Sequence, residues 1–280
     1  MTLKAGIVGW PVTHSLSPVL HGYWLKEYGI DGEMLRAPAR PEEFTDVIAR
    51  LRGEGFKGVN VTVPHKEAAF ALADNKAHSA QEAGAANLLV FRAEGIEAHN
   101  TDTIGLVESL RANVSLAGRS VVLLGAGGAA RGAVLALNQL DAATIHILNR
   151  STARAETLAK ALQPILKSRL VPGALEDWKD VAGDAALLLN STSAGMTGNA
   201  PLDLDLSVLN KDAAVCDIVY NPLQTRLLKD AAARGHKTID GLGMLMHQAV
   251  PSFEAFFGVR PQVTPGLRAE LERVLRERQA

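Results

Sequence analysis

The segment VVLLGAGGAARGAV, residues 121–134, constrains the fold more than any other part of the chain. It places Gly125, Gly127 and Ala130 in the spacing Gly-x-Gly-x-x-Ala, after an apolar run and before an amphipathic one. In a strand–turn–helix unit the first glycine permits a tight turn, the second lets a pyrophosphate approach the backbone, and the alanine allows close packing of helix on strand. The segment therefore predicts a dinucleotide-binding βαβ unit, and a glycine-rich turn without a ligand is the alternative.

The rest of the chain has the pattern of α/β proteins, in which short apolar runs bounded by Gly or Pro alternate with longer amphipathic stretches. Strands are expected within residues 5–11, 58–64, 120–124, 143–150, 185–195, 212–222 and 237–240, with a hairpin-like return over 87–100. Helices are expected within residues 17–29, 41–55, 65–75, 126–140, 152–162, 225–236, 243–258 and 265–278. In the first of these helices Ser17 can serve as the N-cap, Pro18 as the first helical residue and Gly29 as the exit.

A chain of 280 residues is long enough for two domains. We expect a substrate-binding and catalytic α/β domain over residues 1–101, and a doubly wound Rossmann-type domain over residues 102–242. We expect the helices of residues 243–280 to pack back on the first domain.

The strand after the glycine segment indicates which dinucleotide binds. An NAD site usually ends this strand with Asp or Glu, which accepts a hydrogen bond from the ribose 2′-hydroxyl. The sequence here is ILNRSTAR, with Asn149 in place of the carboxylate and two arginines close behind it. The side chains expected around a 2′-phosphate are Asn149, Arg150, Ser151, Thr152 and Arg154. We therefore predict NADP rather than NAD, and arginines on a solvated helix start are the alternative.

The charges and the cysteine count exclude several classes of partner and compartment. The formal net charge of −1 gives no reason to expect binding to nucleic acid or to an anionic membrane. The single cysteine, Cys216, excludes an intramolecular disulfide and a thiolate zinc site. The N-terminal segment lacks the apolar length of a signal sequence, and no stretch reaches about 18 apolar residues. We expect a cytoplasmic protein that acts on a small molecule and uses no metal.

A nicotinamide-dependent reaction also needs a group that moves the substrate's hydroxyl proton. The usual Tyr-x-x-x-Lys arrangement is absent from the sequence, and the scattered histidines lack the spacing of zinc ligands. The segment VNVTVPHKEAA, residues 59–69, offers Lys66 instead.

Lys66 follows a predicted strand and lies at the start of a predicted helix. Strand periodicity turns Val59, Val61 and Val63 toward the core and leaves a solvated polar face with Asn60, Thr62 and Pro64. If Pro64 begins the helix, Lys66 lies in the first turn, where the helix dipole disfavours a cation and favours the neutral amine that acts as a base. An ordinary exposed lysine is the alternative reading.

Asp102, in HNTDTIGLVESL, is the candidate partner of Lys66. A carboxylate beside the amine would hold it in place but would favour the ammonium form, so the protonation state of Lys66 stays open. An aspartate at a helix start is also an ordinary N-cap.

Eight segments together resemble the shikimate dehydrogenase family in their order and separation. They are SLSP, NVTVPHK, GAANLL, NTDTIG, GAGGAARG, NRSTARA, YNPLQTRLL and GLGMLMHQA, and they span nearly the whole chain. The resemblance implies reversible, NADP-linked hydride transfer between shikimate and 3-dehydroshikimate, on the pathway to chorismate and aromatic amino acids. It also implies an active site in a cleft between the two domains.

The resemblance assigns roles to individual residues. Lys66 matches the catalytic lysine of the family and Asp102 its paired carboxylate. Ser15 and Ser17 match the hydroxyls that hold the substrate's carboxylate. The positions that match ring-hydroxyl contacts are Thr62, Asn87, Asp102, Tyr220 and Gln248. The positions that match the cofactor site are Gly125, Ala126, Gly127, Gly128, Ala129, Ala130, Asn149 to Arg154, Ile218, Gly241 and Met244, the last of which is equally compatible with a core methionine.

Two positions depart from the family pattern around the ring hydroxyls. Leu88 stands where threonine usually follows the asparagine, and Thr103 where glycine usually follows the aspartate. These two positions leave quinate or an amino analogue open as the preferred substrate. A quinate/shikimate dehydrogenase that uses NAD is a close alternative, against which Arg150 and the missing carboxylate argue. A non-catalytic NADP-binding sensor is a more distant one, and a methyltransferase reading of the glycine segment is weaker because it gives Arg150 no role. The expected assembly is a monomer or a homodimer.

Overall fold

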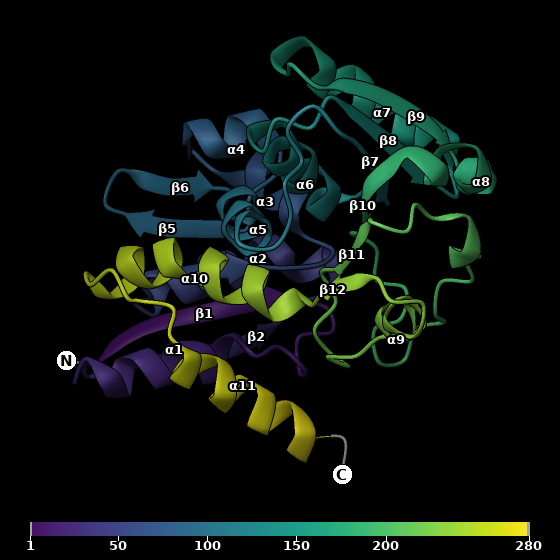
Figure 1. Cartoon of the computed structure of the whole chain (residues 1–280). Coiled ribbons are helices and arrows are strands. Elements are labelled where there is room, and N and C mark those ends of the chain that lie inside the picture. Colours follow the sequence, from purple (N-terminus) through teal and green to yellow (C-terminus); the bar gives the residue numbers. More distant parts are fainter. Residues whose placement is uncertain (1, 279–280) are drawn as a thin grey trace. The chain divides into compact units, whose positions relative to one another are not determined.

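The computed structural model describes residues 2–278 and has an α/β fold (Figure 1). The chain divides into two compact units, each with its own sheet. The first unit runs to Asp102 and resumes at Met246, and the second comprises Thr103–Leu245. Asp102 thus lies in the first unit, and residues 243–245 lie in the second. None of the helices described within residues 2–278 is long and apolar enough to cross a membrane.

The sheet of the first unit is mixed, with six strands in the order β2-β1-β3-β5-β6-β4. The strands are β1 Leu3–Gly9, β2 Gly32–Pro38, β3 Gly58–Val61, β4 Asn75–Lys76, β5 Leu88–Arg92 and β6 Gly95–His99. β1 pairs in parallel with both β2 and β3. β5 is antiparallel to β3 and to β6, which confirms the hairpin-like return predicted for residues 87–100.

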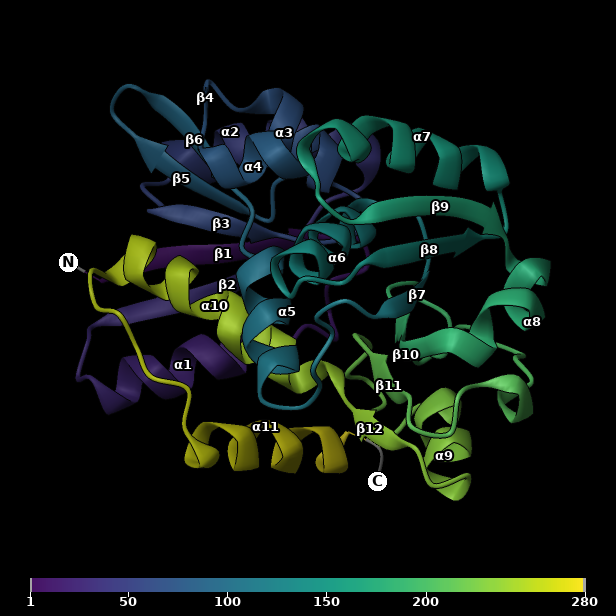
Figure 2. The same cartoon turned by 45° about the horizontal axis from the view of Figure 1, so that its top comes forward.

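Helices cover both faces of the first sheet (Figure 2). They are α1 Ser17–Glu27, α2 Phe44–Gly53, α3 Lys66–Leu72, α4 His78–Ala83, α10 Gly241–Phe257, which belongs to this unit from Met246, and α11 Pro265–Glu277. Phe44 and Ile48 of α2 join Val59 of β3 in one buried cluster. Toward the other face, Phe256 and Phe257 of α10 come so close to Gly58 and Gly32 that added side chains there would collide with them. The apolar faces of both helix layers are therefore buried against the sheet.

The sheet of the second unit is wholly parallel, with six strands in the order β12-β11-β10-β7-β8-β9. The strands are β7 Ser120–Leu124, β8 Thr144–Asn149, β9 Arg169–Ala174, β10 Ala185–Asn190, β11 Ala214–Asp217 and β12 Lys237–Ile239. The chain starts in the middle, winds outward to β9, returns to β10 and winds outward again to β12. This is the strand order of the dinucleotide-binding fold, which binds its ligand where the winding reverses, between β7 and β10.

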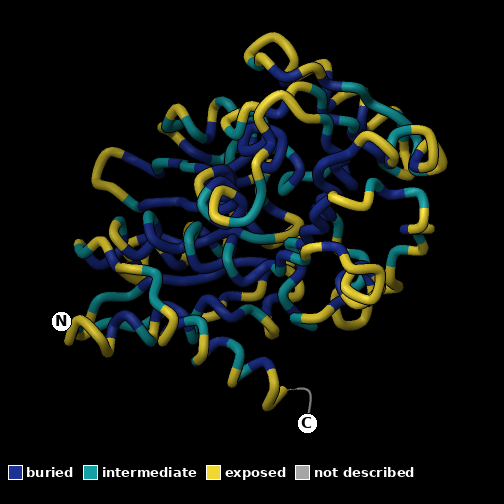
Figure 3. The backbone as a smooth tube through the Cα atoms, viewed as in Figure 1, coloured by how far each residue is buried: buried dark blue, intermediate teal, exposed yellow. Residues whose placement is uncertain are grey.

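The inner strands β7, β10 and β11 of the second sheet consist almost wholly of buried residues, which Figure 3 colours dark blue. Leu123 of β7 packs in a cluster with α5 Asp102–Arg111, α6 Gly128–Gln139 and α7 Thr152–Leu162. Val122, its neighbour, packs on the opposite face in a cluster with α8 Trp178–Val181 and α9 Arg226–Ala233. Because successive strand residues point to opposite faces, the continuous apolar run VVLL is what a doubly covered parallel strand requires.

Candidate active site

Lys66 and Asp102 form an ion pair in the first unit. Lys66 Nζ donates to Asp102 Oδ2 at 2.5 Å, and the two side chains are 13% and 4% exposed. Thirty-six positions separate the residues in the chain. Charged groups so little exposed are seldom found without a partner, and here each is the partner of the other.

The segment before Lys66 differs from the expected strand. β3 ends at Val61, the amide of His65 donates to the carbonyl oxygen of Thr62 at 3.0 Å, and the Val63–Pro64 peptide is cis. Strand alternation therefore stops early, and Val63 is 59% exposed instead of facing the core. Pro64 does not begin the helix, which starts at Lys66 itself, after His65 as the N-cap residue.

His65 fixes the backbone directly before Lys66. Its side chain is buried, its Nε2 lies 2.8 Å from the carbonyl oxygen of Ala39, and its ring stacks on Phe44 with centroids 4.6 Å apart. Lys66, the first residue of α3, thus directly follows a histidine whose side chain is fixed by Ala39 and Phe44.

Asp102 is held by its neighbours in the chain and by Asn87. Asn87 Nδ2 donates to Asp102 Oδ1 at 2.8 Å, and the amide of Asp102 donates to Asn100 Oδ1 at 3.0 Å. Asn100 Nδ2 in turn donates to the carbonyl oxygen of Ala85 at 3.0 Å. Both carboxylate oxygens of Asp102 thus accept from side chains, so the simple N-cap reading of this aspartate does not describe it.

Asn87 joins three further polar groups to the ion pair. It donates to Thr101 Oγ1 at 2.9 Å and to Gln248 Oε1 at 3.2 Å, and its Oδ1 accepts from the amide of Thr101 at 2.7 Å. Asn87 and Gln248 were predicted as site residues from the resemblance, whereas Thr101 was not. Thr101 directly precedes Asp102, and that adjacency was the signal available for it.

Asn60 also lies in this region, but it is buried and not on a solvated face. Its Nδ2 donates to Ser252 Oγ at 2.7 Å, and its Oδ1 is a buried acceptor with no hydrogen-bond partner among the described residues. The expected solvated face is absent because α10, which carries Ser252, packs over this face of β3. Thr62, the next polar residue, is half-buried directly after the strand.

Ser15 and Ser17 lie together where the loop after β1 meets α1. The amide of Ser17 donates to Ser15 Oγ at 3.2 Å, and Ser15 Oγ donates to Ser17 Oγ at 3.3 Å. Ser17 is the first residue of α1, and the N-cap residue is Leu16, whose side chain makes no capping hydrogen bond. The expectation that Ser17 caps α1 is therefore wrong, because its hydroxyl accepts from Ser15 and not from the helix backbone.

The substrate residues predicted from the resemblance fall in both units. Tyr220 lies in the second unit, between β11 and α9, and is half-buried. The others lie in the first unit: Ser15, Ser17, Thr62, Lys66, Asn87, Asp102 and Gln248. Of the two departures from the family pattern, Leu88 is a buried core residue, and Thr103 Oγ1 donates to the carbonyl oxygen of Gly132 at 3.4 Å.

The glycine segment of the second unit forms a turn from β7 into α6. Gly125 has φ +108°, and a Cβ there would lie 2.9 Å from Ser191 Oγ and from Thr192 Cγ2, so the fold itself requires glycine. Gly127, the N-cap residue of α6, has φ −102° and open space around its Cα. Beyond its neighbours in the chain, no atom of residues 2–278 comes within 4 Å of the position that a Cβ on Gly127 would take, so the described residues do not themselves require glycine there. Ala126, Gly128 and Ala129 continue this turn into α6, and Ala130 is buried against the sheet.

The end of β8 carries the residues predicted around a 2′-phosphate. Asn149 Nδ2 donates to the carbonyl oxygen of Ser151 at 3.0 Å, and Ser151 is the N-cap residue of α7, which begins at Thr152. Arg150 and Arg154 are exposed, and neither forms an ion pair within residues 2–278. Two such guanidinium groups at a helix N-terminus fit a dianionic phosphate.

The remaining predicted cofactor contacts lie around the end of β11. A side chain on Gly241 would collide with the carbonyl oxygen of Ile218, so glycine is needed there. Ile218 is half-buried against the main core cluster of the unit, and Met244 is buried within that cluster. The side chain of Met244 is therefore that of a core methionine.

Asp217 anchors the loops beside this site. Its carboxylate accepts from Asn190 Nδ2 at 2.9 Å, from the amide of Val219 at 3.0 Å and from Thr225 Oγ1 at 2.7 Å. Burial raises the pKa of Asp217, and these three hydrogen bonds oppose that rise. The ends of β10 and β11 are thereby joined through one buried group.

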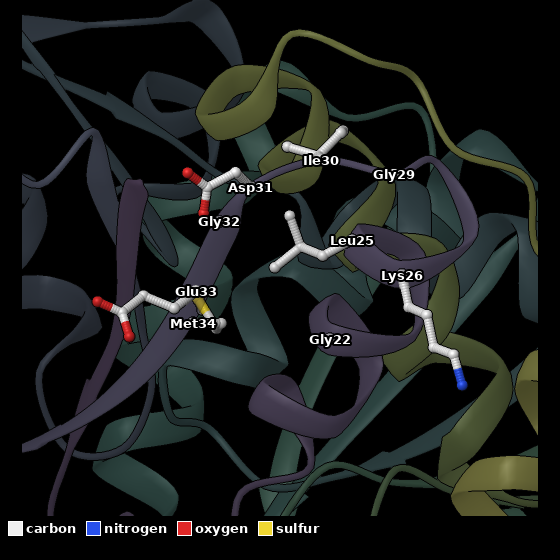
Figure 4. Close-up of a pocket in the computed structure, with 9 residues that line it drawn as sticks. All are labelled: Gly22, Leu25, Lys26, Gly29, Ile30, Asp31, Gly32, Glu33 and Met34. Carbon is white, nitrogen blue, oxygen red and sulfur yellow. The ribbon is translucent and has the colours of Figure 1, made fainter. Parts of the chain in front are cut away.

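A hollow of about 660 Å³ lies elsewhere in the first unit, between α1 and β2 (Figure 4). Its charged lining consists of Lys26, Asp31 and Glu33. None of the predicted site residues lines it.

These features define the class of two-unit α/β proteins in which a doubly wound dinucleotide-binding unit accompanies a second unit with its own polar site. Two family models match the chain: a shikimate dehydrogenase substrate-binding domain over residues 7–89, and a shikimate / quinate 5-dehydrogenase over residues 108–197. The chain belongs to the shikimate dehydrogenase family.

Relatives and solved structures match over nearly the full length. The chain is 48% identical over 272 residues to shikimate dehydrogenase (NADP(+)) of Paramagnetospirillum magneticum, covering 95% of this chain and 96% of that protein. It resembles the Thermus thermophilus shikimate 5-dehydrogenase in complex with NADP(H) and shikimate, with 32% identity, a TM-score of 0.84 and 99% of both chains covered. It also resembles quinate dehydrogenase of Corynebacterium glutamicum in complex with NAD, with 29% identity, a TM-score of 0.86, and 98% of this chain and 99% of that one covered.

Proposed function

We propose that this protein is an NADP-dependent shikimate dehydrogenase that interconverts shikimate and 3-dehydroshikimate. The observation that carries the proposal is the nearly buried Lys66–Asp102 pair, because it supplies an acid/base group within a cluster of polar side chains able to bind hydroxyls. The family membership and the named relatives support the substrate and the cofactor.

In this proposal Lys66 moves the proton of the reacting hydroxyl. Its ammonium form donates to Asp102 and can protonate a carbonyl oxygen during reduction, while its neutral form accepts the hydroxyl proton during oxidation. Asp102 orients the amine and offers its remaining lone pairs to a ring hydroxyl. The polar side chains proposed to bind the other ring hydroxyls are those of Thr62, Asn87, Thr101, Tyr220 and Gln248.

NADP supplies the hydride acceptor for oxidation when it is bound. The turn from Gly125 to Ala130 would hold its pyrophosphate, and the open space at Gly127 fits the close approach that this requires. Arg150 and Arg154, with Ser151 and Thr152, would bind the 2′-phosphate. Ile218 and Gly241 would line the nicotinamide pocket, with Met244 supporting it from the core.

The residues after β8, Arg150 and Arg154 above all, are what we expect to favour NADP over the NAD of a quinate dehydrogenase. The test is NADPH or NADH formation by the wild type with shikimate and with quinate, each with NADP and with NAD. We expect the highest kcat/KM for shikimate with NADP. Arg150→Asp should shift the cofactor preference toward NAD by about 2 kcal/mol, roughly thirtyfold, since it replaces a phosphate-binding charge with a repelling one. An unchanged preference in that variant, or a wild type inactive on both acids, would contradict the proposal.

We also propose a cytoplasmic location and a monomeric or homodimeric state. A single buried cysteine suits a reducing compartment. Size-exclusion chromatography with light scattering measures the assembly directly, and a tetramer or larger would contradict this part.

A further inference from the structure

The loop that carries Ser15 is tied to two arginines that are distant in sequence. Arg36 of β2 donates through its Nη2 to the carbonyl oxygen of Ser15 at 2.8 Å. Arg278, directly after α11, donates through its Nη1 to the carbonyl oxygen of His14 at 2.8 Å. Two guanidinium groups therefore bind two successive carbonyl groups of one loop, from opposite ends of the unit's sequence.

Both hydrogen bonds hold the backbone that determines the position of the Ser15 and Ser17 hydroxyls. Ser15 also donates from its amide to the carbonyl oxygen of Val12 at 3.1 Å, and its Oγ meets both the amide and the hydroxyl of Ser17. A rotation of the peptide groups at His14 and Ser15 would move Ser15 Oγ away from Ser17. Leu16 is fully buried and pins the far side of the loop, so the peptide groups before it are the part that the arginines control.

The fold brings the two arginines to the same loop from distant parts of the sequence. Arg36 lies on the edge strand of the first sheet, next to β1, whose end leads into the loop. α11 packs against α1, and Arg278, which directly follows α11, reaches the loop at His14. The arginines at positions 36 and 278 thus meet at one loop although 242 positions separate them (278 − 36).

We propose that Arg36 and Arg278 are positioning residues that hold the Ser15–Ser17 loop in the geometry that binds the substrate's carboxylate. The inference rests on the proposed function, in which these serines bind that carboxylate. Each arginine acts through the loop backbone and contributes to the binding of acids rather than to the proton transfer at Lys66.

The test compares Arg36→Gln, Arg278→Gln and the double variant with the wild type in shikimate oxidation. We expect KM for shikimate to rise about threefold in each single variant and about tenfold in the double variant, as expected when exposed hydrogen bonds to backbone are lost additively. We expect kcat and KM for NADP to stay within about twofold, since Lys66 and the glycine turn are untouched. The matched controls are Arg50→Gln and Arg276→Gln, which remove exposed arginines that pair with Glu54 and Glu272 and make no bond to this loop.

Two further measurements separate positioning from other causes. With the methyl ester of shikimate, which has no carboxylate, the double variant and the wild type should differ by less than about twofold. At about 1 M salt, where long-range charge effects are screened, the increase in KM for shikimate should persist. The proposal would be overturned if the increase in KM for shikimate disappeared at high salt, or if KM for the methyl ester increased equally.

A Ser15→Ala/Ser17→Ala variant separates this inference from the proposed function. If it binds shikimate as the wild type does, the assigned role of the serines is wrong. If it raises KM while the arginine variants leave KM unchanged, the positioning role of the arginines alone is wrong.

Discussion

His21 of α1 titrates in an environment that penalises its charged form. The side chain is 0% exposed, and neither ring nitrogen has a hydrogen-bond partner among the described residues. Its ring lies among aromatic rings, with centroids 6.1 Å from Trp24, 5.7 Å from Phe253 and 6.2 Å from Phe256. Burial lowers the pKa of His21 from 6.5 to about 3.

This lowered pKa makes the first unit less stable in acid. Between pH 6.5 and about 3 the unfolded chain binds a proton at His21 that the folded protein does not bind, so stability falls as the pH drops below 6.5. A pH of about 5 lies roughly 1.5 units below the unfolded-state pKa of His21. At about 1.4 kcal/mol per unit, the free energy of unfolding is therefore lower by about 2 kcal/mol at that pH. Above the unfolded pKa this penalty vanishes.

The substitution His21→Leu removes the titrating group and two buried nitrogens without partners. We expect the variant to be about 1 kcal/mol more stable than the wild type at about pH 7.5, and about 3 kcal/mol more stable at about pH 5. Urea unfolding followed by tryptophan fluorescence and circular dichroism at both pH values measures this. His78→Gln, in which an 84% exposed histidine is replaced, is the control. If the wild type and His21→Leu lose equal stability between the two pH values, the reasoning is refuted.

Three further predictions concern the second unit. Gly125→Ala should destabilise it by about 2–4 kcal/mol, because of the positive φ and the contacts with Ser191 and Thr192, whereas Gly127→Ala should leave the urea midpoint unchanged. Gly127→Ala should instead weaken NADP binding at least about tenfold in a fluorescence titration, and unchanged binding would contradict the assigned pyrophosphate contact. Asp217→Ala should cost about 2–4 kcal/mol by leaving Asn190 and Thr225 without their buried acceptor, and a loss no larger than that of the exposed Asp203→Ala would contradict this role.

The sequence predicted the central strands of both sheets but missed β2, β4 and β9, which are edge strands. In β2 Met34 and Ala37 are buried while Leu35 and Arg36 are exposed, so neither alternation nor a continuous apolar run marks the strand. β9 contains Pro172 and Gly173, which are tolerated at a sheet edge and argue against a strand when only the sequence is read.

The polar site was harder to predict than the fold because it depends on pairing and on contacts between distant residues. Periodicity placed Asn60 on a solvated face, yet α10 covers that face through Ser252 and Asn60 is buried. Local chemistry alone left Lys66 as an exposed lysine or a base, and Asp102 as its candidate partner or an ordinary N-cap. The resemblance then assigned the two residues as a pair. Arg278 and His14 lie 264 positions apart, and no local pattern indicates that they meet.

The most direct test of the central claim is the turnover of Lys66→Ala with shikimate and NADP. We expect kcat to fall by about 10²–10⁴-fold, the usual contribution of a general acid/base, while NADPH binding measured by fluorescence stays within about twofold of the wild type. A Lys66→Ala variant that binds NADPH normally and turns over within about tenfold of the wild-type rate would contradict the assignment of Lys66 as the proton-transfer group.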